Sequence, residues 1–146
     1  MARNVIFICT GNSARSIMAE GLLTKYGSEK YTAFSAGMEA KGINPYTVKV
    51  LDEIGVDTST FQSKSVKDIM GRMEFDDAVI VCRKAEEQCP TINADARRIH
   101  RWLFDDPVKA DGTEEEKLAK FREVRNQIDA RLQLWIAENA EAEWTK

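Results

Sequence analysis

The sequence of 146 residues contains few of the side chains on which metal sites and structural disulfides depend. It has one histidine, His100, and three cysteines, Cys9, Cys82 and Cys89. Because no two cysteines form a close C-x-x-C pair, we expect no zinc site and no other bound metal. In the reducing compartment that we predict for this chain, the three cysteines are expected to be reactive rather than structural.

Long apolar stretches and a large charge of either sign are also lacking. The apolar run near the N-terminus is too short for a signal peptide or a membrane span. A formal net charge of −3 does not indicate a nucleic acid or a membrane as a partner. Without repeats or low-complexity segments, the length suits one domain over residues 1–146. We expect a cytoplasmic protein.

Apolar runs alternate with helical patterns along the chain. The runs predict strands at Val5–Cys9, Tyr31–Ala36, Ala78–Val81 and Ala96–Leu103. Apolar spacing and capping residues predict helices over 13–26, from Pro45 behind the cap Asn44, from Ser65, and after Thr113. The last helix has an apolar stripe formed by Leu118, Phe121, Val124, Ile128, Leu132 and Trp135. This order predicts an α/β fold, an open parallel four-stranded sheet with helices on both faces.

A cysteine stands where the first predicted strand meets the first predicted helix. It opens the run Cys9-Thr10-Gly11-Asn12-Ser13-Ala14-Arg15-Ser16. Small residues let backbone N–H groups turn inward around a tetrahedral anion, and the helix N-terminus adds positive potential. Arg15 can bind two anion oxygens, and the same field favours the thiolate form of Cys9. We predict an oxyanion loop with Cys9 as nucleophile; the alternative is a small buried cysteine at a strand end.

Two further groups follow predicted strands. Cys82 comes after Ala78–Val81, and Asp105-Asp106-Pro107 comes after the fourth strand. Because active sites of parallel sheets gather at the carboxyl ends of the strands, both are expected near the Cys9 loop. Taken singly, Cys82 could simply complete a buried strand, and the aspartates could be turn residues.

Cys82 and Cys89 are seven positions apart, separated by good helix formers. In a helix they would lie roughly 10 Å apart along the axis. A disulfide needs Cα atoms within roughly 7 Å, so a bond between them would require the helix to unwind. Pro90 and the shortness of the segment make unwinding easy. The alternative is that Cys89 is an incidental packed cysteine.

Four motifs in order resemble the thioredoxin-coupled arsenate reductases, which share their fold with the low-molecular-weight protein tyrosine phosphatases. The motifs are CTGNSARSIMAEG from Cys9, Ser35-Ala36-Gly37, Val81-Cys82 with Cys89-Pro90, and Phe104-Asp105-Asp106-Pro107. The Cys82/Cys89 pair is typical of the reductases. Val108-Lys109-Ala110 stands where the phosphatases usually carry aromatic residues, which also favours the reductase.

The resemblance implies reduction of arsenate to arsenite by a relay of three thiols. Cys9 would attack arsenic in a loop formed by residues 10–16, with Arg15 binding the oxyanion and Asp106 protonating the departing hydroxide. Cys82 and then Cys89 would carry the disulfide to thioredoxin or a similar reductant. Asp106 is preferred to Asp105 because it directly precedes the proline.

Some family members bind potassium near the loop through an Asn, a Glu, a Ser and an Asp. Asn12, Glu20 and Ser35 match the first three, whereas Lys64 stands at the fourth position. A lysine ammonium there would repel potassium and replace its charge. We therefore predict that the chain needs no metal or other cofactor, apart from the external thiol reductant.

Two other functions remain open on the sequence. The first is a low-molecular-weight tyrosine phosphatase whose two extra thiols regulate it by oxidation. The second is a non-catalytic protein that binds arsenite or a soft metal through three thiolates. Binding alone would leave Arg15 and Asp106 without a role.

Overall fold

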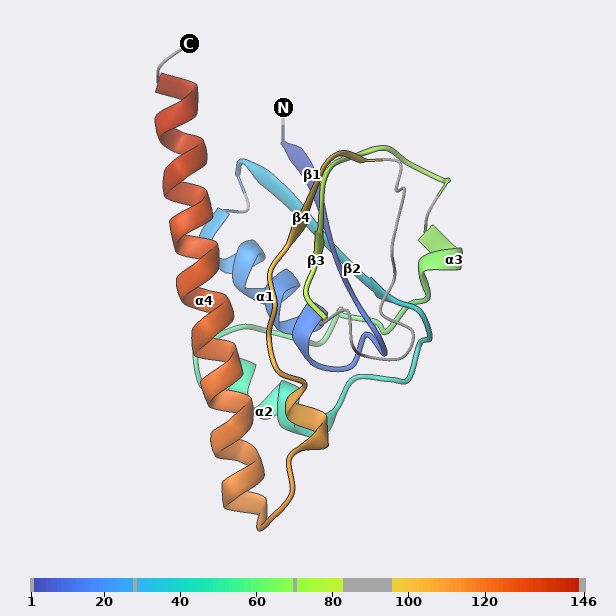
Figure 1. Cartoon of the computed structure of the whole chain (residues 1–146), viewed down its shortest axis with the longest axis vertical. Helices are drawn as coiled ribbons and strands as arrows, with labels where there is room; N and C mark the ends of the chain where they lie inside the picture. The colour runs from blue at the N-terminus through green and yellow to red at the C-terminus, as the bar shows by residue number, and fades with distance from the viewer. Residues whose placement is uncertain (1, 28, 70, 83–95, 145–146) are drawn as a thin grey trace.

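The computed structural model describes residues 2–27, 29–69, 71–82 and 96–144. Four parallel strands form one sheet in the order β2-β1-β3-β4 (Figure 1). The strands are β1 (Arg3–Cys9), β2 (Tyr31–Gly37), β3 (Phe75–Ile80) and β4 (Ala96–Arg101). Cys9 is in register with Gly37, and Ile8 with Ile80, so β1, β2 and β3 end at the same edge. The predicted sheet is confirmed.

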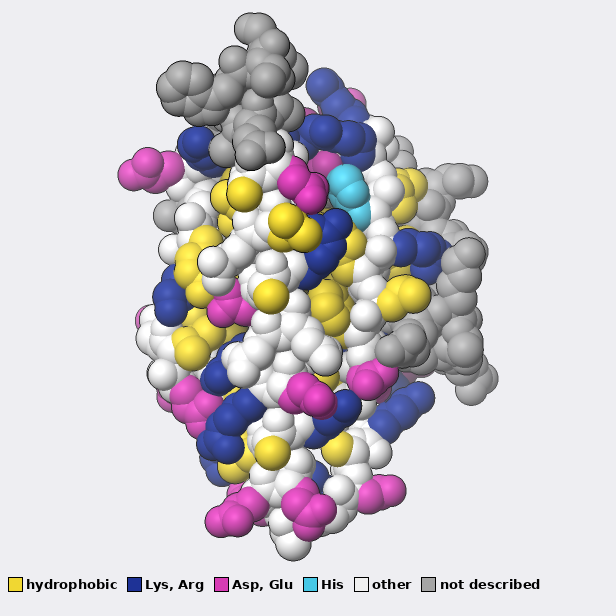
Figure 2. Space-filling model, turned by 60° about the vertical axis from the view of Figure 1, so that its left-hand side comes forward, with side chains coloured by type: hydrophobic (Ala, Val, Ile, Leu, Met, Phe, Trp, Pro, Cys, Tyr) yellow, Lys and Arg dark blue, Asp and Glu magenta, His cyan; other side chains and the backbone are white. Residues whose placement is uncertain are grey.

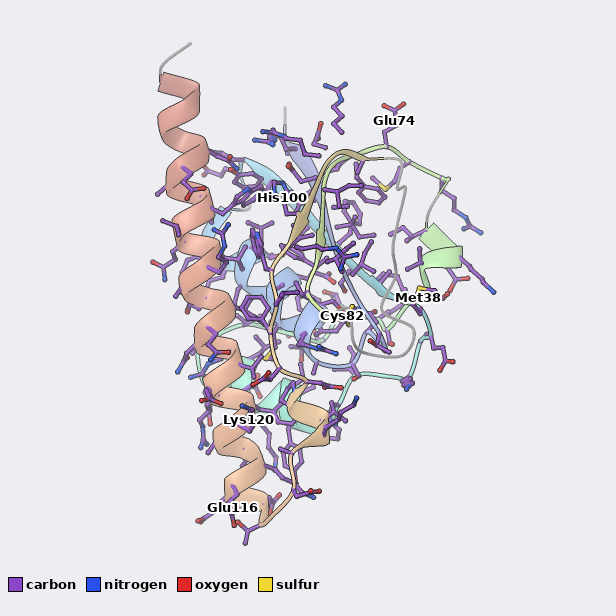
Figure 3. The ribbon with its side chains drawn as sticks, viewed as in Figure 1. Met38, Glu74, Cys82, His100, Glu116 and Lys120 are labelled. Carbon is purple, nitrogen blue, oxygen red and sulfur yellow. The ribbon has the colours of Figure 1, made fainter. Side chains whose placement is uncertain are left out.

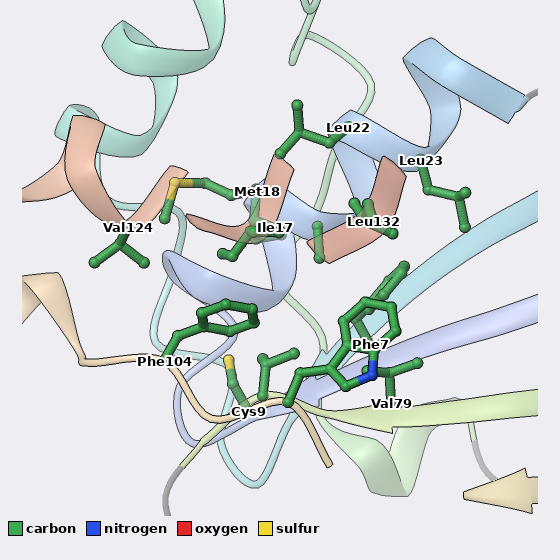
Figure 4. Packing of buried hydrophobic residues seen from close by; sticks show 14 of the residues in the cluster. Phe7, Cys9, Ile17, Met18, Leu22, Leu23, Val79, Phe104, Val124 and Leu132 are labelled. Atoms are coloured by element: carbon green, nitrogen blue, oxygen red, sulfur yellow. The ribbon is translucent and has the colours of Figure 1, made fainter. Parts of the chain in front are cut away.

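Helices cover both faces of this sheet. Alternate residues of β1 point to opposite faces: Val5, Phe7 and Cys9 join a cluster with α1 and α4, whereas Ile6 and Ile8 join a second cluster with α3. Figure 4 shows Cys9 in the first cluster, beside Phe104 and below α1. The helices are α1 (Arg15–Gly27), α2 (Pro45–Asp52), α3 (Val66–Ile69) and α4 (Glu114–Trp144), with a 3-10 turn η1 (Pro107–Lys109).

The long helix α4 begins at the predicted capping box. Glu116 N–H donates to Thr113 Oγ1 at 3.2 Å, and Thr113 N–H donates to Glu116 Oε1 at 3.3 Å. Its predicted apolar stripe is buried from Phe121 to Trp135, with Leu118 partly buried. On the outer side of the molecule, charges of both signs mix with scattered hydrophobic side chains (Figure 2). None of the helices in the described ranges, α4 included, is apolar over a length that could cross a bilayer.

All four strands differ from the prediction at one or both ends, by one to three residues, and β3 shows the largest difference. β3 begins at Phe75 rather than Ala78, and the added residues include Asp77, which is fully buried. A buried carboxylate is tolerated in a strand only when it is paired, and Asp77 lies 2.7 Å from Arg3 Nη2 and 2.9 Å from His100 Nε2. β4 ends at Arg101 rather than Leu103, because the chain then turns toward the Asp-Pro segment.

The Asp77 cluster lies toward the amino-terminal edge of the sheet. Burial alone would raise the pKa of Asp77, but the hydrogen bond to His100 and the positive charges of Arg3 and Arg98 outweigh it, so the pKa is lowered. Figure 3 shows His100 far along the sheet from Cys82. The cluster is therefore separate from the carboxyl edge at which β1 delivers Cys9.

The first helix begins two residues later than predicted, at Arg15. The Ser13 carbonyl accepts hydrogen bonds from Asn44 N–H and Thr47 Oγ1, whereas the Ala14 carbonyl accepts the bond from Met18 N–H. Ser13 is consequently part of the loop, and Ala14, whose carbonyl accepts the first helical bond, is the N-cap of α1. The Asn44 cap of α2 and the short helix after Ser65 are as predicted, whereas the segment 83–88, whose residues are good helix formers, lies outside the described residues.

Candidate active site

Every carbonyl group of the loop between β1 and α1 accepts a hydrogen bond from a residue outside the loop. The oxygens of residues 9–14 accept hydrogen bonds from, in order, Met38 N–H, Glu39 N–H, Lys41 N–H, the Ser63 hydroxyl, Asn44 N–H and Met18 N–H. In a planar trans peptide, the next N–H points away from the carbonyl. The loop amides therefore turn toward the inside of the loop, where an anion would be bound, at the N-terminus of α1.

Two backbone features fix the shape of this loop. Asn12 has φ 47°, in the left-handed region that asparagine tolerates, and its side-chain oxygen accepts the Lys64 N–H at 2.7 Å. Gly37, at the end of β2, passes directly beneath the loop. A methyl group on Gly37 would lie 2.6 Å from Asn12 N and 2.9 Å from Gly11 C, so only glycine fits. The loop is preformed before any anion binds.

The Cys9 sulfur lies at the base of the loop, almost fully buried, as a free thiol. It lies 2.8 Å from Ser16 Oγ and accepts the Asn12 N–H at 3.2 Å. Asn12 Nδ2 donates to the same Ser16 oxygen at 2.7 Å, which leaves the Ser16 hydroxyl proton available to the sulfur. The Ser16 hydroxyl and the Asn12 N–H thus hold the sulfur in place at the base of the loop.

Arg15 and Asp106 face each other across the loop. Arg15 is 2% exposed, and its Nη1 donates to the Phe104 carbonyl at 3.1 Å. Its Nη2 lies 3.6 Å from Asp106 Oδ2. The other Asp106 oxygen accepts the Val108 N–H at 3.1 Å, which caps η1. Asp105, in contrast, points to α4 and lies 3.2 Å from Lys120 Nζ.

These groups line a pocket of about 390 Å³. Its walls comprise Cys9, Thr10, Gly11, Ser13, Ala14, Arg15, Glu39, Lys41, Asp106, Val108 and Lys109. Of the predicted loop residues, Asn12 and Ser16 lie behind the wall and hold the sulfur. Glu39 and Lys41 were not predicted; their position directly after Ser35-Ala36-Gly37, at the carboxyl end of a parallel strand, could have identified them.

Comparison with known proteins identifies the family. The model for low molecular weight phosphotyrosine protein phosphatases matches residues 4–144. The chain belongs to this family. Its relatives include the arsenate reductase of Shouchella clausii, 44% identical over 134 residues that cover 90% of this chain and 94% of the relative. The arsenate reductase of Bacillus subtilis is 43% identical over 129 residues, covering 88% and 91%.

Solved structures agree with this assignment. The crystal structure of arsenate reductase from Archaeoglobus fulgidus superposes with a TM-score of 0.76 at 26% identity, over 91% of this chain and 98% of that one. The comparisons confirm the resemblance to arsenate reductases that the motifs indicated.

The second cysteine of the predicted relay lies close to the family's loop. Val81 N–H donates to the Ile8 carbonyl at 2.9 Å, which places Cys82 next to the end of β1 (Figure 3). Cys82 is fully buried in the same cluster as Cys9. It is part of a disulfide, whereas Cys9 is free. The predicted partner Cys89 lies outside the described residues.

The residues that match the family's potassium ligands come together behind the loop. Ser35 Oγ donates a hydrogen bond to Glu20 Oε1. Burial raises the pKa of Glu20, while the Ser35 hydrogen bond and the positive charge of Lys64 act in the opposite direction. The Lys64 ammonium donates to the Gln62 carbonyl at 2.8 Å. Lys64 thus supplies a positive charge to the Glu20 carboxyl, next to the segment that holds Asn12.

Proposed function

We propose that this chain is an arsenate reductase that uses Cys9 as its nucleophile. The observation that carries the proposal is the preformed loop with a doubly hydrogen-bonded Cys9 sulfur at its base and Arg15 beside it. Arsenate is a tetrahedral oxyanion, which the loop amides and a planar guanidinium bind well. Relatives named arsenate reductase at 44% and 43% identity support the choice of substrate.

In the first step, the Cys9 thiolate attacks arsenic, an S–As bond forms and an As–O bond breaks. The departing hydroxide needs a proton, which Asp106 supplies. Asp106 suits this task because its carboxyl lies in the pocket, 3.6 Å from Arg15. Arsenic remains in its pentavalent state at the end of this step.

In the second step, Cys82 attacks the Cys9 sulfur. A Cys9–Cys82 disulfide forms, the S–As electron pair stays on arsenic, and trivalent arsenite leaves. Cys89 then attacks Cys82, which frees Cys9 and leaves a Cys82–Cys89 disulfide.

A thioredoxin-type protein in the cytoplasm would return the pair to thiols, with two electrons used per arsenate reduced. No metal takes part in these steps. The Lys64 charge near Glu20 supports a site that works without potassium.

The pocket favours a small inorganic oxyanion over a phosphotyrosine. Its described walls contain no aromatic side chain, and Val108 and Lys109 occupy the segment after the Asp-Pro. A ring of phosphotyrosine would therefore lack a stacking partner. Binding of arsenite alone would not explain a buried arginine and a carboxyl facing each other inside the pocket.

The function is tested by arsenate-dependent NADPH consumption with thioredoxin and thioredoxin reductase supplied. Wild type should sustain turnover, and Cys9→Ser should abolish it, because a serine alkoxide does not form at neutral pH in this loop. Hydrolysis of an aryl phosphate, which needs no thiol reductant, is measured alongside. Rapid hydrolysis without arsenate turnover would identify a phosphatase instead, and arsenite binding without either reaction would identify a binder.

The relay is tested separately with the other two cysteines. Cys89→Ser should release one arsenite per chain and stop as a Cys9–Cys82 disulfide, which peptide mapping detects. Cys82→Ser should stop at the arsenic adduct and release none. Repeated turnover by Cys89→Ser with thioredoxin alone would exclude the third thiol from the relay.

A further inference from the structure

The mouth of the pocket carries charged side chains that the steps above do not use. Glu39 and Lys41 line it from the segment after β2, and Lys109 lines it from η1. All three are exposed. Their charges are therefore available to an ion that approaches from solvent.

Lys41 is attached to the loop itself. Its N–H donates to the Gly11 carbonyl at 3.1 Å, and its side-chain stem lies across Gly11. A methyl group on Gly11 would lie 3.0 Å from Lys41 Cδ and 3.4 Å from Cγ. Since the ammonium is only two bonds beyond Cδ, this packing keeps its charge at the rim of the oxyanion loop.

Long-range attraction from the rest of the protein is not available to the substrate. The chain carries a formal net charge of −3, which repels an arsenate dianion at a distance. Attraction has to come from charges at the mouth, where Arg15 is buried and already lies near Asp106. An exposed cation at the rim would act first on the incoming ion.

We propose that Lys41 is a substrate-binding residue that draws the arsenate dianion into the loop, with Glu39 opposing it. This inference rests on the proposed function and names how its substrate is captured. The charge acts across a solvent-exposed rim, so its effect is moderate and falls with salt. It acts on binding and not on the chemical steps, because Lys41 packs against Gly11 at the rim, whereas the sulfur is held by Ser16 and Asn12.

The test compares three charge changes in the full chain. Lys41→Met should raise the KM for arsenate roughly 3- to 10-fold at low ionic strength, with kcat within about twofold. Glu39→Gln should lower the KM by about twofold. Lys67→Met, a matched loss of one exposed lysine on α3, should leave the KM unchanged. Added salt should narrow the difference between wild type and Lys41→Met.

A KM for Lys41→Met equal to that of wild type at low ionic strength would overturn the proposal. So would a raised KM in Glu39→Gln, because damage to the loop, unlike a charge effect, moves both variants in the same direction. Calorimetric titration with inorganic phosphate measures the same capture without turnover. If wild type fails to reduce arsenate but Lys41→Met still weakens phosphate binding, the proposed function falls and the role of Lys41 in anion capture stands.

Discussion

Replacing Asp106 by asparagine should slow formation of the arsenic adduct by about 10²–10⁴-fold. This factor corresponds to about 3–5 kcal/mol of transition-state stabilisation. Asparagine preserves the size of the side chain and an oxygen that can accept the Val108 N–H, so η1 should remain in place. It lacks the acidic proton that the departing hydroxide needs. Oxyanion binding should not weaken, because a negative charge 3.6 Å from Arg15 is removed.

The neighbouring aspartate provides the matched control. Asp105 lies 3.2 Å from Lys120 Nζ, and both side chains are substantially exposed, at 50% and 32%. Exposed ion pairs contribute about 0–1 kcal/mol, so Asp105→Asn should change the same rate by about fivefold or less. The two substitutions remove the same charge from adjacent positions, and only one of them lies in the pocket.

The assay is a rapid-quench measurement of arsenite released by pre-reduced protein in a single turnover, without external reductant. Calorimetric titration with inorganic phosphate reports oxyanion binding in the same variants. If Asp105→Asn is the more damaging change, the assignment of the acid is wrong. If Asp106→Asn loses phosphate binding along with its rate, Asp106 shapes the pocket rather than supplying a proton.

Three other changes probe the anion site, the sheet and the loop support. Arg15→Lys should lower kcat/KM by at least about 100-fold, since the two-pronged contact is worth a few kcal/mol; a near-normal rate would argue against it. Asp77→Asn should lower the free energy of unfolding by about 3–5 kcal/mol in denaturant titrations, whereas exposed Asp111→Asn should not. The pKa of Asp77 is lowered in the folded protein, so the difference in free energy of unfolding between wild type and Asp77→Asn should depend on pH. It should be complete above about pH 4–5 and should disappear as the pH falls through the pKa of Asp77. A difference that does not change with pH would contradict this. Exchange of potassium for sodium should leave arsenate turnover unchanged, because the Lys64 ammonium takes the place of a potassium ion. Lys64→Met should lower the melting temperature, because Glu20 then lacks its positive neighbour. Strong activation of wild type by potassium would refute this role of Lys64.

Local signals in the sequence were sufficient for some elements and not for others. The start of α4 depends on Thr113 and Glu116, which are three residues apart, so a capping pattern predicts it. The start of β3 depends on Asp77 finding Arg3 on another strand, 74 positions away. When the partner of a carboxylate is so distant in the sequence, the local pattern places the end of the strand at the carboxylate.

In the candidate active site, too, some features could be predicted from the sequence and others could not. Active sites of parallel sheets lie at the carboxyl ends of the strands, and this regularity predicted that the Cys9 loop and Asp106 lie at one edge of the sheet. It could not predict that Lys41 covers Gly11, because this contact depends on how the chain turns after Gly37. The preference for Asp106 over Asp105 came from the proline beside it, and the geometry gives the two aspartates different neighbours.

The close approach of Gly37 to the loop has a consequence for selectivity. The backbone amides of the loop and its close contact with Gly37 favour a tetrahedral shape and negative charge rather than a particular central atom. Phosphate has both, and it should occupy the same place as arsenate. Discrimination must then arise after binding, from the readiness of pentavalent arsenic to accept two electrons from sulfur, which phosphorus lacks. Phosphate would therefore act as a competitive inhibitor, and its concentration would set the rate at which this protein works.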